Sequence, residues 1–279
     1  KDGRRFTDQS NYATMEFKDE IVNRDPRLTQ TIRSTKINMK VTMTGYHLLK
    51  YSNDDMSYTG SSSNDLPLFR LAEVYLNYAE AKAELGSLTQ TDLDNTINKL
   101  RARAGLTGLT GKLNMADANQ NPDPYLSNAE TGYVNVGASN KGIILEIRRE
   151  RTIELMMEGF RYYDLMRWKE GQCIAQEFKG IYLPATAVNK AYDLDGDGTK
   201  DVCFYNTTTQ PNEGDVVYVQ LASDGSGTTL SGETKGNLLC YDWIDRTWDE
   251  NRDYLYPIPR QEITLSNGVV KQNPGWEEK

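Results

Sequence analysis

The sequence predicts a mainly α fold in which a helical scaffold carries long irregular loops and short β-hairpins. Three observations predict it. Apolar residues recur at helical spacing between residues 68 and 104, and the stretch from Ile144 to Glu170 contains no proline. Long segments rich in Gly, Asn, Asp, Ser and Thr separate and follow these parts. Loops of that length in a compact protein are usually functional, so we expect them to carry the functional residues.

Composition argues against two classes of function. The 279 residues carry a formal net charge of −8, whereas nucleic-acid binding favours a basic surface. The longest apolar runs fall short of the length that a membrane-spanning helix needs. The three cysteines are odd in number and far apart, so they predict no disulfide framework.

Two helices are expected in the first half of the chain. The first follows a stripe of apolar residues and ends at Gly86; the second begins at Thr91 or Asp92 as its cap and ends before Gly105. The apolar stripes are Leu68, Leu71, Ala72, Tyr75, Leu76, Ala79 and Ala83, then Leu93, Ile97, Leu100 and Ala104. An antiparallel pair with small residues at its contact is typical of a tetratricopeptide repeat, although no clean second repeat follows.

The remaining segments are predicted to be irregular or β-like. The run from Ile37 to Tyr46 is β-like, and residues 106–141 are interpreted as a long loop. Residues 179–240 are interpreted as irregular, with short β-like runs such as Val216 to Leu221. The tail from Tyr254 contains Pro-Ile-Pro, which favours extended backbone because proline cannot continue a helix.

The stretch from Ile144 to Glu170 is predicted to be one long helix with Gly159 inside it. Glu150, Glu154 and Glu158 recur every four residues, so their carboxylates lie on one helix face. The adjoining faces carry three arginines and one aspartate, namely Arg151, Arg161, Arg167 and Asp164. Because these charges are interleaved with large apolar residues, we expect a buried network of ion pairs.

We expect no catalytic residues in this network. A glycoside hydrolase needs two carboxyl groups on opposite sides of the scissile bond, whereas acids four residues apart on one helix point the same way. Arg149, Arg151 and Arg161 lie close enough to neutralise the acids and lower their pKa values. His47 is the only histidine, and the chain contains no Gly-x-Ser-x-Gly motif. The sequence therefore favours a protein without enzymatic activity.

The segment from Asp193 to Asp201 resembles a calcium-binding loop. Acids at positions 1, 3, 5 and 9 with Gly196 at position 6 match most of an EF-hand-type loop, but position 12 is Phe204. We expect one structural Ca²⁺, with an acidic solvated turn lacking metal as the alternative. The predicted ligands are Asp193, Asp195, Asp197, Asp201 and the backbone carbonyl of Thr199.

Aromatic residues in the irregular segments are the predicted ligand platform, because sugar rings stack their C–H faces on aromatic rings. The candidate ligand-binding residues are Asn38, Tyr46, Tyr51, Tyr58, Tyr125, Tyr133 and Trp243, with Asn53 and Asp55 as further polar partners. For each of these residues, ordinary packing or an idle surface position remains the alternative.

Three ordered motifs resemble those of SusD-like (SusD/RagB) proteins. Residues 148–168, RRERTIELMMEGFRYYDLMRW, resemble the E-R-x-x-E-L-x-x-E-G-x-R-x-x-D-L-x-R-W signature of that family. Asp65 to Gly86 is similar to its R-x-A-E-x-x-L-x-x-A-E-A helix, and Tyr254 to Trp276 is similar to its Y-L-x-P-I-P…Q-N-P-G-W ending. The motifs span most of the chain, so the resemblance is specific.

The resemblance implies a fold, a location and partners. SusD-like proteins are surface lipoproteins of the outer membrane in Bacteroidetes-type bacteria, with tetratricopeptide-type helices as a scaffold. They bind a nutrient such as an oligosaccharide or polysaccharide without cleaving it and deliver it to a SusC-like TonB-dependent transporter. A peptide-binding member of the family and a structural helical-repeat scaffold with protein partners only are the alternatives.

The resemblance also implies that the chain is incomplete. Family members are longer, so residues 1–279 are expected to be the C-terminal part of a single SusD-like domain. An N-terminal half is expected to complete the ligand site and to pack on the apolar stripe of the first helix. The residues expected beneath it are Leu71, Tyr75, Leu76 and Ala79.

Overall fold

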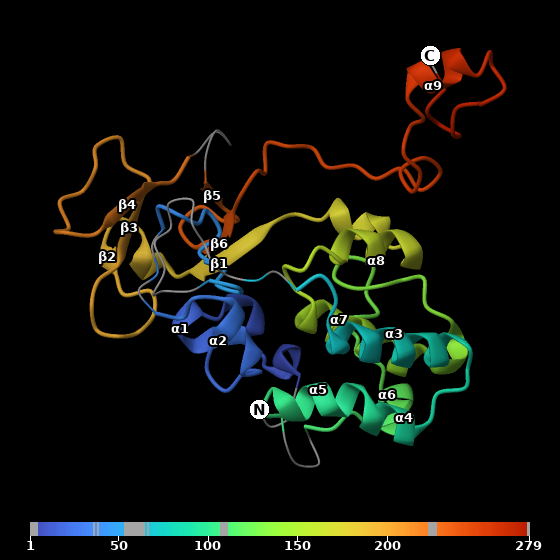
Figure 1. The fold of residues 1–279 in the computed structure, drawn as a ribbon. Helices are drawn as coiled ribbons and strands as arrows, with labels where there is room; N and C mark the ends of the chain where they lie inside the picture. Colours follow the sequence, from blue (N-terminus) through green and yellow to red (C-terminus); the bar gives the residue numbers. More distant parts are fainter. Residues whose placement is uncertain are drawn as a thin grey trace.

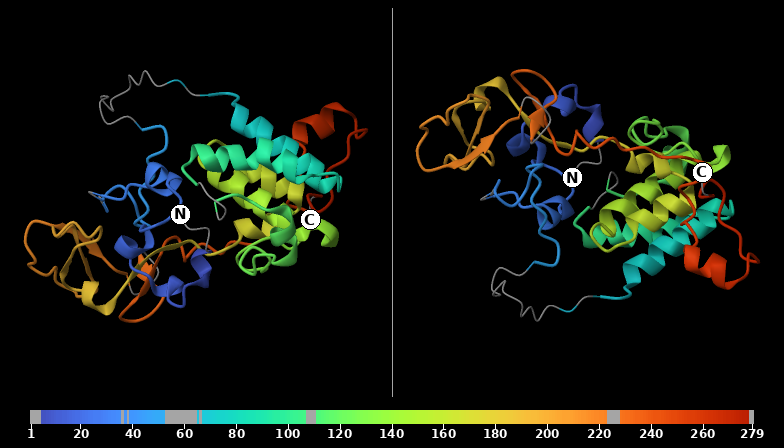
Figure 2. Two further views of the ribbon diagram at one scale, coloured as in Figure 1. Left: turned by 90° about the horizontal axis from the view of Figure 1, so that it is seen from below. Right: turned by 90° about the horizontal axis from the view of Figure 1, so that it is seen from above.

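The computed structural model of the protein describes residues 5–35, 37, 39–52, 65, 67–106, 111–222 and 228–277. Helices α3 to α8 lie together on one side, and two small sheets lie on the other side with α1 and α2 (Figures 1 and 2). The fold is thus helical with small sheets, as the sequence predicts in outline. Among the described residues, no helix is both long and apolar enough to cross a membrane.

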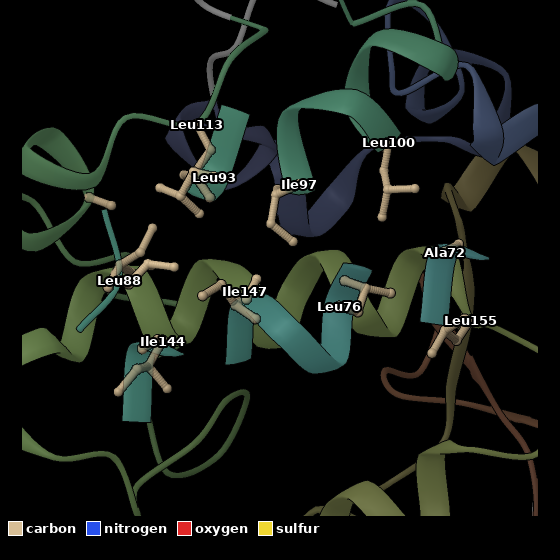
Figure 3. Close-up of a cluster of buried hydrophobic side chains, with 14 residues drawn as sticks. Ala72, Leu76, Leu88, Leu93, Ile97, Leu100, Leu113, Ile144, Ile147 and Leu155 are labelled. Atoms are coloured by element: carbon tan, nitrogen blue, oxygen red, sulfur yellow. The ribbon is translucent and has the colours of Figure 1, made fainter. Parts of the chain in front are cut away.

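Helix α7 (Lys141–Glu154) lies at the centre of the helical part. It packs on α3 (Leu71–Glu84) and on α6 (Met115–Gln120), while α5 (Ile97–Arg103) also contacts α3. Figure 3 shows Leu76, Ile97 and Ile147 pointing toward one another in the buried cluster. The small residues of α3 in this cluster, Ala72, Ala79 and Ala83, allow the close approach of the helices. Burial of this face therefore joins helices that lie far apart in the sequence.

The second predicted helix is divided in two. Helix α4 (Gln90–Asn95) and α5 meet at Thr96, whose backbone angles of −127° and −89° are not helical. The cap is Thr89 rather than Thr91 or Asp92, because the Thr89 side chain and Asp92 form a reciprocal capping box. The predicted loop over residues 106–141 also contains α6, which the Asn114 side chain caps.

The prediction of one continuous helix from Ile144 to Glu170 is wrong. Helix α7 ends at Glu154, and α8 (Arg161–Trp168) begins after a turn in which Met157 and Gly159 have φ angles of 64° and 83°. Lys50 Nζ donates to the Glu154 and Met156 carbonyls at 2.8 and 2.9 Å. These carbonyls accept bonds from a distant cation instead of from the next helical turn, which favours ending the helix there.

Two three-stranded sheets form the other part of the molecule. The first has the order β1 (Lys179–Leu183), β6 (Gly236–Leu239), β5 (Thr229–Leu230), and both pairs are antiparallel. The second has the order β2 (Ala191–Tyr192), β3 (Val202–Tyr205), β4 (Val217–Gln220), with β3 and β4 parallel. The predicted strand near Val216 is therefore confirmed, whereas residues 179–240 contain more sheet than the sequence analysis assigned.

The N-terminal segment packs on the sheets. Phe17 of α1 (Phe17–Glu20) is buried with Ile181, Leu183 and Phe204 in one apolar cluster. The predicted strand at residues 37–46 is not a strand in the described residues; it attaches to β1 where Ile181 N donates to the Thr44 carbonyl at 2.9 Å. The remaining short helices are α2 (Arg27–Thr31), η1 (Phe6–Asp8), η2 (Tyr12–Thr14), η3 (Ala138–Asn140), η4 (Gly171–Ile174) and η5 (Ala185–Ala187).

The tail after β6 is extended and ends in α9 (Arg260–Leu265), beyond the helical part in Figure 1. It is attached at Gly171, where the backbone N–H donates to the Tyr254 hydroxyl at 3.0 Å and Trp248 lies against the glycine. A side chain at residue 171 would collide with the indole ring, so this contact requires glycine. All described residues of α9 remain at least partly exposed.

The apolar stripe of α3 is covered differently from the expectation. Leu76 and Ala79 are fully buried beneath α5 and α7, so the expectation that a further part of the protein packs on them is wrong. Of the other two expected residues, Leu71 is 61% exposed and Tyr75 is partly buried against the same cluster. Val74 and Tyr78, which are 57% and 48% exposed, extend the exposed apolar face of α3 beyond Leu71.

Candidate functional site

Glu150 and Glu154 of the predicted carboxylate series lie on α7, buried and paired, whereas Glu158 lies in the turn after α7, so the prediction that all three share one helix face is wrong. Glu150 and Glu154 are 1% and 3% exposed. Glu154 accepts hydrogen bonds from Arg27, Arg70 and Arg103 at 2.9, 2.6 and 2.5 Å. Arg27 also donates to Glu150 at 2.6 Å. The prediction of a buried ion-pair network is therefore confirmed, but the bonds that Glu154 accepts come from three distant segments of the chain and not from the predicted Arg149, Arg151 and Arg161.

The electrostatics of this network oppose a role as a proton donor. Burial alone raises the pKa of Glu154, but hydrogen bonds from Arg70, Arg27 and Arg103 outweigh it and leave the pKa below its ordinary value. Bonds from Arg70 and from a lysine likewise outweigh burial and lower the pKa of Glu158. These carboxylates thus stay ionised and hold the N-terminal segment, α5 and the start of α3 to the end of α7.

A second group of pairs joins α7, α8 and α3. Arg151 Nε donates to Asp164 Oδ2 at 2.7 Å across the turn between α7 and α8. Arg167 donates to both Asp164 and Glu80, and Glu80 lies on α3. The charged motif residues of the two helices therefore serve the packing of the helices.

Two of the predicted ligand-binding tyrosines make close contacts within the protein. Tyr133 is 4% exposed, and its ring lies edge-on to Trp168 at 5.5 Å with Arg148 and Arg161 over it. Tyr46 is partly buried and donates its hydroxyl proton to Glu20 at 2.9 Å. Tyr133 offers no free face for a sugar, so the structure corrects that assignment to packing, whereas a ligand role for the partly exposed Tyr46 stays a prediction.

Tyr51 and Tyr125 are the other predicted tyrosines that the structure describes, and both are partly exposed. Tyr51 is 40% exposed and lies beside Lys50 at the end of α7. Tyr125 is 42% exposed, and burial of its hydroxyl raises its pKa. A ligand-binding role for Tyr51 and for Tyr125 therefore stays a prediction. Asn38, Asn53, Asp55 and Tyr58 lie outside the described residues.

Trp243 lies in a surface hollow of about 320 Å³ formed by residues 175–177 and 242–246. Its ring is 47% exposed and stands 5.4 Å from that of Tyr241, which is 42% exposed. The lining residues are Ala175, Glu177, Asp242, Trp243, Ile244, Asp245 and Arg246. The hollow therefore combines aromatic surface with three carboxylates and one guanidinium.

Arg246 holds the walls of this hollow together. Its Nη1 donates to the Gln176 carbonyl at 3.0 Å, and its Nη2 donates to the Cys240 and Tyr241 carbonyls at 3.3 and 3.1 Å. The guanidinium also stacks on Phe178 with its centre 4.0 Å from the ring centroid. These bonds fix the turn after β6, where Tyr241 adopts a φ angle of 60°.

Most of this hollow was missed from the sequence. The run from Tyr241 to Arg246 alternates aromatic and acidic residues, which is the one local signal that marks it. Glu177 precedes the run by more than sixty residues and reaches it because β1 pairs with β6. Asp242 accepts a hydrogen bond from Thr229 Oγ1 at 2.7 Å, which orients its carboxylate.

The acidic loop joins β2 to β3. Carboxylate oxygens of Asp193, Asp195 and Asp197 lie within 4.8 Å of one another. Gly196 N and Gly198 N donate to Asp193 at 2.8 and 2.9 Å, and these glycines have φ angles of 80° and 92°. The positive φ angles favour glycine at both positions. The loop thus folds its three acids toward one another.

The other two predicted metal ligands have different surroundings. Asp201 accepts a bond from Leu194 N at 2.8 Å, which closes the base of the loop. Burial raises the pKa of Asp201, and the neighbouring aspartates raise it further. Thr199 N donates to Asp197 at 2.7 Å, and the role of the Thr199 carbonyl stays a prediction. Clustered acids of this kind have the chemistry of a Ca²⁺ ligand set.

Comparisons with known proteins agree with the motif resemblance. The sequence profile SusD_RagB, described as the SusD family, matches residues 33–276. A solved SusD-like protein from Bacteroides fragilis is 23% identical with a TM-score of 0.46, and the match covers 84% of this chain and 31% of that one. Two structures of the protein BT4246, one in its selenomethionine form, are 23% identical with TM-scores of 0.45 and cover 84% of this chain. These matches cover 30% and 28% of the BT4246 chains, so this chain spans less than a third of the length of those chains.

A search of curated proteins found no match.

Proposed function

Because the chain belongs to the SusD family, we propose that it binds a nutrient glycan at the bacterial cell surface without cleaving it. In this proposal the protein is an outer-membrane lipoprotein that passes the oligosaccharide or polysaccharide to a SusC-like TonB-dependent transporter. Helices α3 to α5 serve as a tetratricopeptide-type scaffold, and the loops around the sheets present the ligand site.

The observation that carries the proposal is the exposed pair Tyr241 and Trp243 beside the carboxylates of the hollow. The two rings offer apolar faces for the C–H surface of a sugar, while Asp242 and Asp245 accept hydrogen bonds from its hydroxyls. A site of this kind binds an open polysaccharide chain, because the hollow lies on the surface and does not enclose its ligand.

Capture without cleavage is supported by the role of the glutamates of α7 and of the turn that follows it, which pair with basic side chains. A glycoside hydrolase needs a carboxylic acid with a raised pKa that reaches the leaving oxygen, together with a second carboxylate. Glu154 and Glu158 have lowered pKa values instead, and Glu150 is buried against Arg27 and Arg101. These three glutamates are therefore committed to holding the fold.

We also propose that the chain is the C-terminal part of a longer SusD-like domain. Its span of less than a third of the solved SusD-like structures supports this. So does the exposed apolar face of α3, which would be covered by further protein. The residues of that face are Leu71, Val74, Tyr78 and Leu85.

A glycan array followed by calorimetric titration tests the function. We expect at least one glycan to bind and to be recovered intact, with no release of reducing ends. Trp243→Ala should weaken binding by at least about tenfold, because aromatic anchors at the centre of a site contribute about 2 kcal/mol or more. Tyr163→Ala, which removes a 66% exposed ring on α8, is the matched control and should leave affinity unchanged.

The alternatives give different results in the same assay. Binding of peptides but not glycans would favour a peptide-binding family member, and binding of neither would favour a structural scaffold. Release of reducing ends would contradict the non-catalytic proposal. The proposal of a longer domain is tested by repeating the titration with a longer protein that contains residues 1–279. It requires that this protein bind the glycan more tightly than residues 1–279 alone.

We further propose that the acidic loop holds one structural Ca²⁺, with Asp193, Asp195, Asp197, Asp201 and the Thr199 carbonyl as ligands at about 2.3–2.6 Å. The clustering of the first three carboxylates within 4.8 Å supports this. The ion would offset the mutual repulsion of the clustered carboxylates.

Adding Ca²⁺ should raise the melting temperature, and chelation should speed amide hydrogen exchange in residues 191–205 but not in α7. Asp195→Asn should abolish both effects, whereas Asp215→Asn, an exposed change in a neighbouring loop, should preserve them. Equal exchange with and without Ca²⁺ would contradict the proposal.

A further inference from the structure

The hollow around Trp243 carries an excess of negative charge. Its lining includes the carboxylates of Glu177, Asp242 and Asp245, against the single guanidinium of Arg246. Lys179 pairs with Glu177 at 3.5 Å, but both side chains of this pair are about half exposed, so the pair is weak. The surface that would meet a ligand is therefore acidic on balance.

Arg246 is poorly placed to receive an anionic ligand. Both terminal nitrogens of its guanidinium donate to backbone carbonyls, and its face lies on Phe178. Three of its five N–H groups are thus committed to backbone carbonyls and hold the turn from Cys240 to Tyr241, which leaves fewer donors for an incoming carboxylate or sulfate. Arg246 is thus first a positioning residue for the platform, and it offsets only part of the negative charge of the three lining carboxylates.

The acids, in contrast, are free to accept hydrogen bonds. Asp242 uses one oxygen for the Thr229 hydroxyl, which fixes its orientation and leaves the other oxygen for a ligand. Asp245 is exposed at the rim of the hollow beside Ile244. Ionised carboxylates are acceptors only, so they suit the hydroxyl groups of a sugar and repel another carboxylate.

We propose that this hollow selects neutral glycans and excludes chains of uronic acids or sulfated sugars. The inference rests on the proposed glycan binding and adds its substrate class. Each acidic sugar would bring a negative charge to the lining carboxylates, and two like charges 4 Å apart repel by about 1 kcal/mol in water and by more near a protein surface. Neutral hexoses place hydroxyls in the same positions without this cost.

A matched pair of ligands tests the selection. The neutral oligosaccharide that binds best on the array is compared by calorimetry with the same oligosaccharide oxidised at C6 to the uronate. We expect the oxidised form to bind at least about tenfold more weakly at low salt. At about 1 M salt, where the screening length is about 3 Å, the difference should shrink. Asp245→Asn should also shrink it, whereas Asp215→Asn, outside the hollow, should not.

The outcomes separate this inference from the function on which it rests. Equal or tighter binding of the oxidised oligosaccharide overturns the charge selection and leaves glycan binding in place. A difference that persists at high salt and in Asp245→Asn also overturns it, because loss of the C6 hydroxyl would then be the cause. If no glycan binds, the proposed function fails and this inference fails with it.

Discussion

Replacing Glu154 with alanine is expected to lower the free energy of unfolding by about 3 kcal/mol or more. Glu154 is 3% exposed and accepts bonds from Arg27, Arg70 and Arg103. The Arg103 side chain is 57% exposed and can turn to solvent, but that of Arg27 is only 9% exposed. Removing the carboxylate leaves buried guanidinium charge with fewer partners, and this is the main cost. Urea unfolding followed by circular dichroism measures it.

The control for this variant is Glu130→Ala, an exposed change that should stay within about 0.5 kcal/mol of the parent protein. A loss within about 0.5 kcal/mol for Glu154→Ala would show that water, rather than Glu154, satisfies the arginines.

The stabilisation by Glu154 depends on pH with a defined sign. The pKa of Glu154 is lowered in the folded state from 4.5, so its stabilising effect is full above that value and is lost as pH falls through the folded pKa. The deficit of the variant should therefore shrink in acid.

Replacing Gly142 with alanine is expected to destabilise the helical part by about 2 kcal/mol or more, at the upper end of overpacking costs. A Cβ atom there would lie 1.7 Å from the Ala118 carbonyl oxygen, where the end of α6 crosses the first turn of α7. The obstacle is backbone, so α6 itself must move. That movement would also strain the bond from Ile143 N to Asn119 Oδ1, which is 2.9 Å long.

Gly137→Ala is the matched control, because a Cβ atom there meets nothing within 4 Å and its φ angle of −58° suits any residue. We expect Gly137→Ala to unfold like the parent protein and Gly142→Ala to unfold at a lower urea concentration. Hydrogen exchange should rise in α6 of Gly142→Ala. Identical unfolding curves for the two variants would contradict the close approach of α6 and α7.

The two candidate sites differ in how far the sequence led to them. The acidic loop is a local motif, so the spacing of its acids and glycines is enough to identify it. In the structure, three of the predicted acids bring their carboxylates together. The hollow at Trp243 depends on β1 and β6 lying side by side, which brings Glu177 next to Asp242. The sequence also does not predict which aromatic residues remain exposed. Tyr133 and Trp243 both lie in irregular segments, yet they are 4% and 47% exposed.

The sequence by itself determined the family, the helical character and the burial of the α7 acids. These follow from residue order and from the four-residue spacing of Glu150 and Glu154, which requires only local geometry. Tertiary structure decided where helices end and which surfaces remain open. Helix α7 ends at Glu154 where Lys50, 104 residues away, binds its carbonyl. Such a bond depends on segments that only folding brings together, and local spacing contains no information about it.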